Sequence, residues 1–127
     1  MQFLLLIIEP PGQRLERTDA EGREAYARMQ RFGESLRAQG KLKAVESLAS
    51  HAHAVRVHTA GGRPQVLDGP FAEAKEMVGG FFLVECADMD EAVAIARDCP
   101  AAGWATVEVR SLAPCFDDSR AEPRVFT

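Results

Sequence analysis

The sequence predicts a single α+β domain whose main elements follow the order β-α-β-β-α-β. Two short apolar runs, residues 3–8 and 81–86, have the length of buried strands. Two longer segments, one at residues 19–39 and one that starts at Asp88, repeat apolar residues at helical spacing. The chain has 127 residues, which suits one domain.

The two apolar runs are the clearest strand signals. Residues 3–8 are too short for a stable helix and are closed by Glu9-Pro10-Pro11-Gly12, which ends regular structure. Residues 81–86 are apolar at every position except Glu85. Strands that are apolar on both faces belong at the centre of a sheet.

The two helices carry start and stop signals. Gly40 offers a C-terminal stop for the helix over 19–39, and Pro100 ends the second helix. The pairs spaced as caps at the two starts are Thr18 with Glu21 and Asp88 with Glu91.

The remaining strands are shorter or more polar. Residues 42–48 favour a short strand, and residues 106–112 alternate apolar and polar side chains. Residues 55–57 alternate as a half-exposed strand should, and the Gly61-Gly62 turn leads into a return arm at 64–67.

This order of elements is the ferredoxin-like arrangement, in which the first and third strands of the sheet are central. Residues 3–8 and 81–86, the two runs that are apolar on both faces, are predicted to take those places. Two helices can cover only one face of the sheet, so the other face would expose a large apolar patch. We expect a second copy to cover it, which predicts a homodimer. The alternative cover is the polar tail, residues 114–127, which follows the domain at 1–113.

Composition excludes several classes of function. The formal net charge is −4 and the sequence has no cluster of basic residues, which argues against nucleic acid or anionic membranes as partners. The first apolar run lacks the features of a signal peptide and is far too short to span a bilayer, so we expect a cytoplasmic protein. Three cysteines without a CxxC pair disfavour a disulfide scaffold. No phosphate loop or dinucleotide-binding glycine pattern is present, and we predict no cofactor.

The segment Asp68-Gly69-Pro70-Phe71 is the most distinctive in the chain. Gly69 tolerates a positive φ, Pro70 fixes its own φ, and the Asp68 carboxylate can accept bonds from nearby backbone amides. A tight turn with Phe71 as an apolar anchor explains all four residues. The functional alternative places the Asp68 carboxylate at the mouth of a cleft, as a general base or ligand contact.

Three charged residues follow the turn. Glu73 and Glu76 would lie on one face of a single helical turn, where their carboxylates could converge for acid–base chemistry, with Lys75 as the electrostatic partner. A solvated charged turn is the alternative.

His51 and His53 would share one face of a strand. Such a pair can bind a divalent metal if a third ligand, Asp68 or Glu9, joins it. Ordinary loop histidines are the favoured interpretation, so no metal site is predicted.

Taken together, several segments strongly resemble the YCII-related family, and more narrowly its bacterial members with a DGPF motif. The likeness covers nearly the whole chain except the tail. The matching segments are Val55-Arg56-Val57, the Gly61-Gly62 hairpin, Asp68 to Glu76, Gly79-Gly80-Phe81, the Asp88 to Ala92 helix start and Val107 to Arg110.

The resemblance implies a dimeric α+β barrel, in which two ferredoxin-like sheets pack face to face. It also implies a context beside extracytoplasmic-function sigma factors. Some relatives are thought to pair a histidine on the first helix with an aspartate for acid–base chemistry that includes dehalogenation of aromatic compounds. This chain has no histidine before His51, and its first helix offers Tyr26 and Met29 in that region.

Three functions follow as hypotheses. The leading one is a homodimeric accessory or regulatory protein that binds a small molecule beside the Asp68 loop. The second is an enzyme that uses acid–base catalysis on a small, aromatic substrate, and the third is an interaction module without a ligand. The predicted catalytic residues are Asp68, Glu73 and Glu76, and the predicted ligand contacts are Tyr26, His53, Asp68, Phe71 and Lys75.

Overall fold

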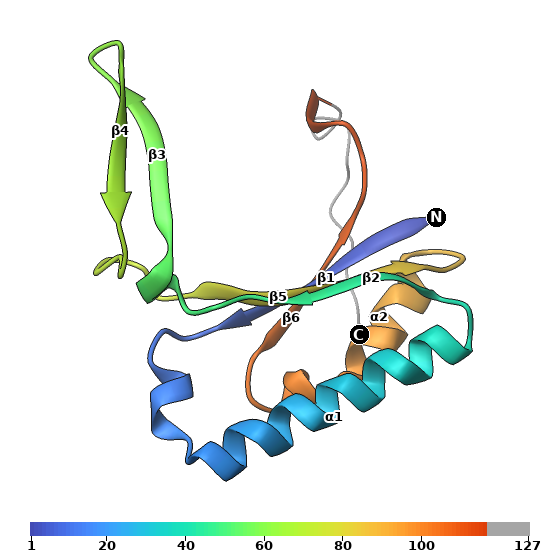
Figure 1. Cartoon of the computed structure of the whole chain (residues 1–127). Coiled ribbons are helices and arrows are strands. Elements are labelled where there is room, and N and C mark those ends of the chain that lie inside the picture. Colours follow the sequence, from blue (N-terminus) through green and yellow to red (C-terminus); the bar gives the residue numbers. More distant parts are fainter. Residues whose placement is uncertain (117–127) are drawn as a thin grey trace.

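The computed structural model describes residues 1–116 and contains a four-stranded antiparallel sheet with both α-helices on one face (Figure 1). The strand order is β2-β5-β1-β6, so β1 and β5 are central. The predicted α+β class, the ferredoxin-like order and the two central strands are therefore confirmed. The elements are β1 (Gln2–Glu9), α1 (Asp19–Ala38), β2 (Leu42–Ser47), β5 (Met77–Glu85), α2 (Met89–Asp98) and β6 (Thr106–Ser111).

Strand β1 shows how the sheet separates its two faces. Phe3, Leu5 and Ile7 are buried in the core beneath the helices. Leu4, Leu6 and Ile8 point the other way and are half-buried, next to Phe81 and Leu83 of β5, which pair with Leu6 and Leu4. We call the surface formed by Leu4, Leu6, Ile8, Phe81 and Leu83 the open sheet face.

Helix α1 begins and ends where the sequence predicts. The Thr18 hydroxyl accepts a hydrogen bond from the Glu21 amide at 3.1 Å, and the Glu21 carboxylate accepts one from the Thr18 amide at 2.9 Å. The bond from the Thr18 amide is the main cause of the lowered pKa of Glu21, because it stabilises the charged carboxylate. Gly40 ends the helix with a φ of +71°, a conformation that glycine adopts without strain. The helix packs on the sheet through contacts such as the edge-to-face pair of Phe32 and Phe82, whose ring centroids lie 5.2 Å apart.

Strand β5 starts at Met77, four residues before the predicted start. Gly79 and Gly80 lie inside the strand, and Gly79 is an extra residue opposite the junction of Ile7 and Ile8 in β1. A Cβ at Gly79 would meet the Glu9 carboxylate at 2.7 Å, and one at Gly80 would meet the Glu46 carbonyl oxygen at 2.8 Å. Both positions therefore need glycine, because atoms of the neighbouring strands lie too close to leave room for a side chain.

A separate two-stranded sheet, β3 (Val55–Ala60) and β4 (Arg63–Asp68), rises on the side of the main sheet opposite the helices (Figure 1). Its turn uses Gly61 and Gly62, both with positive φ, as the hairpin prediction requires. Every residue of both strands is exposed. The prediction that one face of 55–57 is buried is wrong within a single chain, because the hairpin stands away from the core.

Three short 3-10 turns complete the described chain: η1 (Gln13–Glu16), η2 (His51–His53) and η3 (Pro100–Gly103). The three cysteines are free, and burial raises the pKa of the Cys86 and Cys99 thiols. Among residues 1–116, no helix has the length and hydropathy needed to cross a membrane. The predicted tail begins at 114, and its residues 117–127 lie outside the described part of the chain.

Candidate functional site

The Asp68-Gly69-Pro70-Phe71 motif forms the base of the hairpin. The Gly69 amide donates to the Ala54 carbonyl at 2.8 Å, and a Cβ at Gly69 would collide with the backbone carbonyl of His51. Phe71 is buried, with the His51 ring edge-on at 5.8 Å and the Arg56 guanidinium 3.7 Å above its ring. Phe71 thus anchors the turn, as the structural interpretation of the motif predicts. Gly69 does not use the positive φ that was expected of it, and its role is the close approach to the His51 backbone.

A hollow of about 530 Å³, which we call the hairpin-base hollow, opens beside this motif. It brings together His53 and Phe71, two of the predicted ligand contacts, with Glu76, a predicted catalytic residue. His51 also lines it, and the Nδ1 atom of His51 is buried without a hydrogen-bond partner in the described chain.

The prediction that His51 and His53 lie on a strand is wrong. They lie on the 3-10 turn η2, because the Ser50 hydroxyl accepts a bond from the Ala52 amide and stabilises a turn. Within residues 1–116 no three His, Cys, Asp or Glu side chains form a group that could hold a metal ion.

Residues 73–76 form no helical turn. The Ala74 amide donates to the Phe71 carbonyl at 3.0 Å in a tight turn, and the chain then enters β5 at Met77. The shared helical face assumed for Glu73 and Glu76 therefore does not exist. Lys75 and Glu76 line a shallow hollow of about 450 Å³ together with Glu9.

A larger cleft of about 980 Å³ lies between α1 and the sheet, and we call it the α1–sheet cleft. Tyr26 lies on its helical wall and is the predicted ligand contact that this cleft contains. Asp68 is exposed at the end of β4, and neither Asp68 nor Glu73 lines this cleft or the hairpin-base hollow. A single chain therefore does not bring the predicted site residues together in one place.

The α1–sheet cleft contains an ion pair that the sequence interpretation did not assign. Glu9 is 4% exposed, and its Oε1 accepts a hydrogen bond from Arg14 Nε at 2.7 Å. Arg14 also donates to the carbonyls of Leu48 at 2.8 Å and Gly79 at 3.3 Å, which ties together the ends of β1, β2 and β5. Glu9 continues the alternation of Phe3, Leu5 and Ile7, and this period of two is the signal that could have placed it on the helix-covered face.

Trp104 closes one end of the cleft. The guanidinium carbons of Arg17 and Arg28 lie 5.5 and 5.2 Å from the centre of its ring, within the range of cation–π contacts. The Gln13 side chain donates to the Trp104 carbonyl at 2.6 Å and fixes the turn that carries the indole. Both Arg17 and Trp104 line the cleft, so a cation and an aromatic face lie near the Glu9–Arg14 pair.

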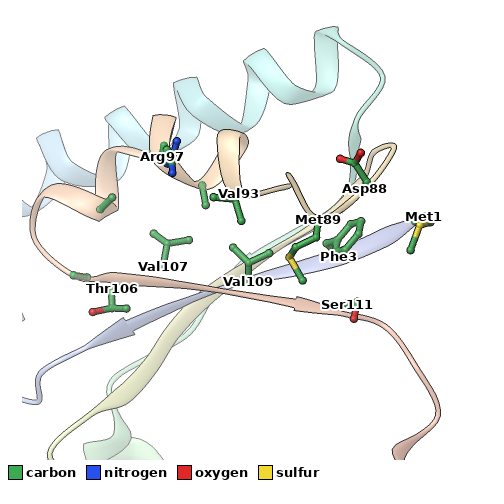
Figure 2. Close-up of a pocket in the computed structure, with 13 residues that line it drawn as sticks. Met1, Phe3, Asp88, Met89, Val93, Arg97, Thr106, Val107, Val109 and Ser111 are labelled. Atoms are coloured by element: carbon green, nitrogen blue, oxygen red, sulfur yellow. The ribbon is translucent and has the colours of Figure 1, made fainter. Parts of the chain in front are cut away.

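A third hollow, of about 1030 Å³, lies between α2 and β6 (Figure 2). Val93 and Met89 face Val107 and Val109 across it, while the charged residues Asp88 and Arg97 are exposed. Binding sites typically combine apolar walls with a few convergent polar groups. The α1–sheet cleft meets that description better, because it contains a buried carboxylate paired with an arginine, a phenol and an indole.

The comparisons with known proteins agree with the fold. The YCII-related domain profile matches residues 1–115, and the chain therefore belongs to the YCII-related family. An uncharacterized protein of Rhizobium meliloti (strain 1021) is 45% identical over 76 residues, which is 58% of this chain and 61% of that protein. The chain thus matches less than two thirds of the length of this relative.

A solved structure with a similar fold is the 5-chloro-2-hydroxyhydroquinone dehydrochlorinase TftG of Burkholderia phenoliruptrix AC1100, in complex with 2,5-dihydroxybenzoquinone. The match covers 89% of this chain and 94% of TftG, with a TM-score of 0.52 and 20% sequence identity. At this identity the likeness shows a shared fold.

Proposed function

We propose that this protein binds a small molecule in the α1–sheet cleft, in an accessory or regulatory role, and that it works as a homodimer. The observation that carries the proposal is the buried Glu9 carboxylate, paired with the half-buried Arg14, inside a cleft whose walls include Tyr26 and Trp104. Burial of the Glu9 carboxylate costs desolvation energy, and its ion pair with Arg14 is weak evidence for stability alone, which favours a role at a site.

The walls indicate the chemistry of the ligand. Met29, Phe82 and Trp104 offer apolar and aromatic surface, and Arg17 and Tyr26 offer a charge and a hydroxyl. These groups fit a small aromatic molecule that carries an acidic or phenolic group. The complex of TftG with 2,5-dihydroxybenzoquinone makes that compound a suitable first probe.

The second candidate function is acid–base catalysis on such a molecule. It is favoured by the position of a carboxylate, Glu9, and a phenol, Tyr26, in one cleft. The roles predicted for Asp68, Glu73 and Glu76 remain proposals, and in a single chain these residues lie outside the cleft.

The binding proposal is tested by mapping bound fragments on isotope-labelled protein with NMR, using 2,5-dihydroxybenzoquinone and a set of small aromatic acids. We expect the shifts to cluster on cleft residues and the dissociation constant to rise roughly tenfold in Arg17→Gln. Arg97→Gln is the matched control, since it removes an exposed arginine from the α2–β6 hollow. Shifts that cluster at that hollow or at the hairpin-base hollow would contradict the proposal.

We infer the homodimer from the open sheet face. Five large apolar side chains are only half-buried there, although each lies within a central strand. Patches of this kind mark interfaces in soluble proteins. Light scattering at micromolar concentration should give twice the chain mass of 13.9 kDa, and a monomer mass would contradict the dimer.

A further inference from the structure

The β3–β4 hairpin receives little support from the rest of its own chain. Its strands pair with each other along their whole length, from Val55 opposite Asp68 to Ala60 opposite Arg63. No residue of either strand is buried. An isolated two-stranded hairpin is marginally stable in water, so a second surface is needed to hold this one.

The base of the hairpin is nevertheless firmly held. Phe71 is buried between the His51 ring and the Arg56 guanidinium, and Gly69 bonds to Ala54. Arg56 belongs to β3, so its contact with Phe71 ties the first strand to the turn that follows the second. The hairpin therefore projects as an arm from a base that is held in place.

One face of the arm is apolar. Val57 pairs with Val66, which places both side chains on the same face, and each is 67% exposed. Val55 lies two residues before Val57 on that face and is also exposed. Exposed valines on neighbouring strands have no role in the fold of the single chain and indicate a contact surface.

The arm and the open sheet face form one continuous surface. Both lie on the side of the sheet away from the helices (Figure 1). The hairpin-base hollow joins them, because its wall combines Ile8 and Val78 of the sheet with His51 and Phe71 of the hairpin base. The Nδ1 atom of His51, which is buried and has no hydrogen-bond partner among residues 1–116, lies at this junction.

We propose that the β3–β4 hairpin is a dimerisation arm whose Val55–Val57–Val66 face packs against the second copy of the chain. The inference rests on the proposed homodimer, since a copy seated on the open sheet face meets the arm that rises beside it.

The test compares the dimer dissociation constants of three variants by sedimentation velocity. Val57→Asp replaces an exposed apolar side chain of the arm, and Leu6→Asp does so on the open sheet face. Leu15→Asp is the matched control, because Leu15 is 90% exposed on η1. We expect Val57→Asp to weaken the dimer by roughly tenfold or more, Leu6→Asp to weaken it further, and Leu15→Asp to leave it unchanged.

Hydrogen exchange of the wild-type protein gives a second measurement that needs no variant. The amides of β3 and β4 should exchange slowly at concentrations that favour the dimer and rapidly after dilution. If Leu6→Asp breaks the dimer while Val57→Asp leaves it as tight as wild type, the arm is not part of the interface, although the homodimer stands. A wild-type protein that is monomeric throughout overturns the homodimer itself. Fast exchange of the arm in the dimer would assign the arm to a different partner and overturn the inference.

Discussion

The hairpin base and the α1–sheet cleft differ in how visible they are in the sequence. The hairpin base is built from one contiguous and distinctive segment, Asp68 to Phe71, and Gly69 and Phe71 have clear structural roles there. The cleft is built from Glu9, Arg14, Tyr26 and Trp104, which are far apart in the chain and belong to no motif. A distinctive contiguous segment reflects the backbone geometry that its own residues must adopt. A site formed by side chains from several elements depends instead on how those elements pack against one another.

The largest expected effect tests the structural role of the hairpin base. Gly69→Ala should lower the free energy of unfolding by about 3 kcal/mol, because the added methyl collides with the backbone carbonyl of His51 and cannot be relieved by a side-chain rotation. Urea denaturation followed by circular dichroism measures the change.

Gly103→Ala is the control for this substitution, because a Cβ there meets no atom within 4 Å. We expect its stability to stay within about 0.5 kcal/mol of wild type. If Gly69→Ala lowers the free energy of unfolding as little as Gly103→Ala does, the backbone at the hairpin base can shift to accept a methyl group. The need for glycine in the motif would then have no structural explanation.

The next effect tests the cleft. Glu9→Gln should cost about 2 kcal/mol, because the half-buried Arg14 guanidinium loses its counter-ion; the partial exposure of Arg14 keeps the cost below that of a fully buried pair. Thermal denaturation gives the stability, and the NMR titration described above should show weaker binding of the aromatic probe.

Arg14→Gln and the double variant complete a thermodynamic cycle for this pair. The double variant should be less destabilised than the sum of the single variants, since neither charge is then left alone. Additive effects would show that Glu9 and Arg14 act independently and would remove the ion pair from the argument for a binding site.

The sequence predicted the fold well because its signals are local. The capping box at Thr18, the stop at Gly40 and the apolar run of β1 each depend on residues within or next to one element. The two errors near the motif are the strand expected for His51 and His53 and the helical turn expected for residues 73–76. Both arose because a local turn, at Ser50 and after Phe71, replaced the regular element that the residue spacing suggested. Glu9 could have been placed on the buried face from the period of two, but its partner Arg14 lies beyond the Pro10-Pro11-Gly12 turn, and no pattern fixes that contact.

A smaller effect concerns the start of the helix that forms one wall of the cleft. Thr18→Ala should cost about 1 kcal/mol because the Glu21 amide loses its cap. The pKa of Glu21 lies below its ordinary value of 4.5 in the folded protein. The stabilisation that Glu21 contributes is therefore present above that value and is lost as the pH falls below it.

NMR titration of the Glu21 side chain measures this effect in both proteins. In Thr18→Ala the pKa should rise part of the way toward 4.5, because the substitution removes the Thr18 hydroxyl but keeps the backbone amide, whose bond is the larger cause of the lowering. Glu91, whose pKa is lowered chiefly by the Ala87 amide, serves as the internal control and should keep its value. An unchanged pKa of Glu21 would show that the Thr18 hydroxyl contributes nothing to the lowered pKa in solution.

The smallest expected effect decides between the two regions. Asp68→Asn keeps the size of the side chain but removes the charge. Asp68 is exposed at the end of β4, so the free energy of unfolding should change by less than about 0.5 kcal/mol. If the α1–sheet cleft is the binding site, the dissociation constant of the aromatic probe is unchanged as well. If binding or turnover is lost in Asp68→Asn while Arg17→Gln has no effect, the carboxylate beside the motif is the functional group, and the cleft is only a gap between helix and sheet.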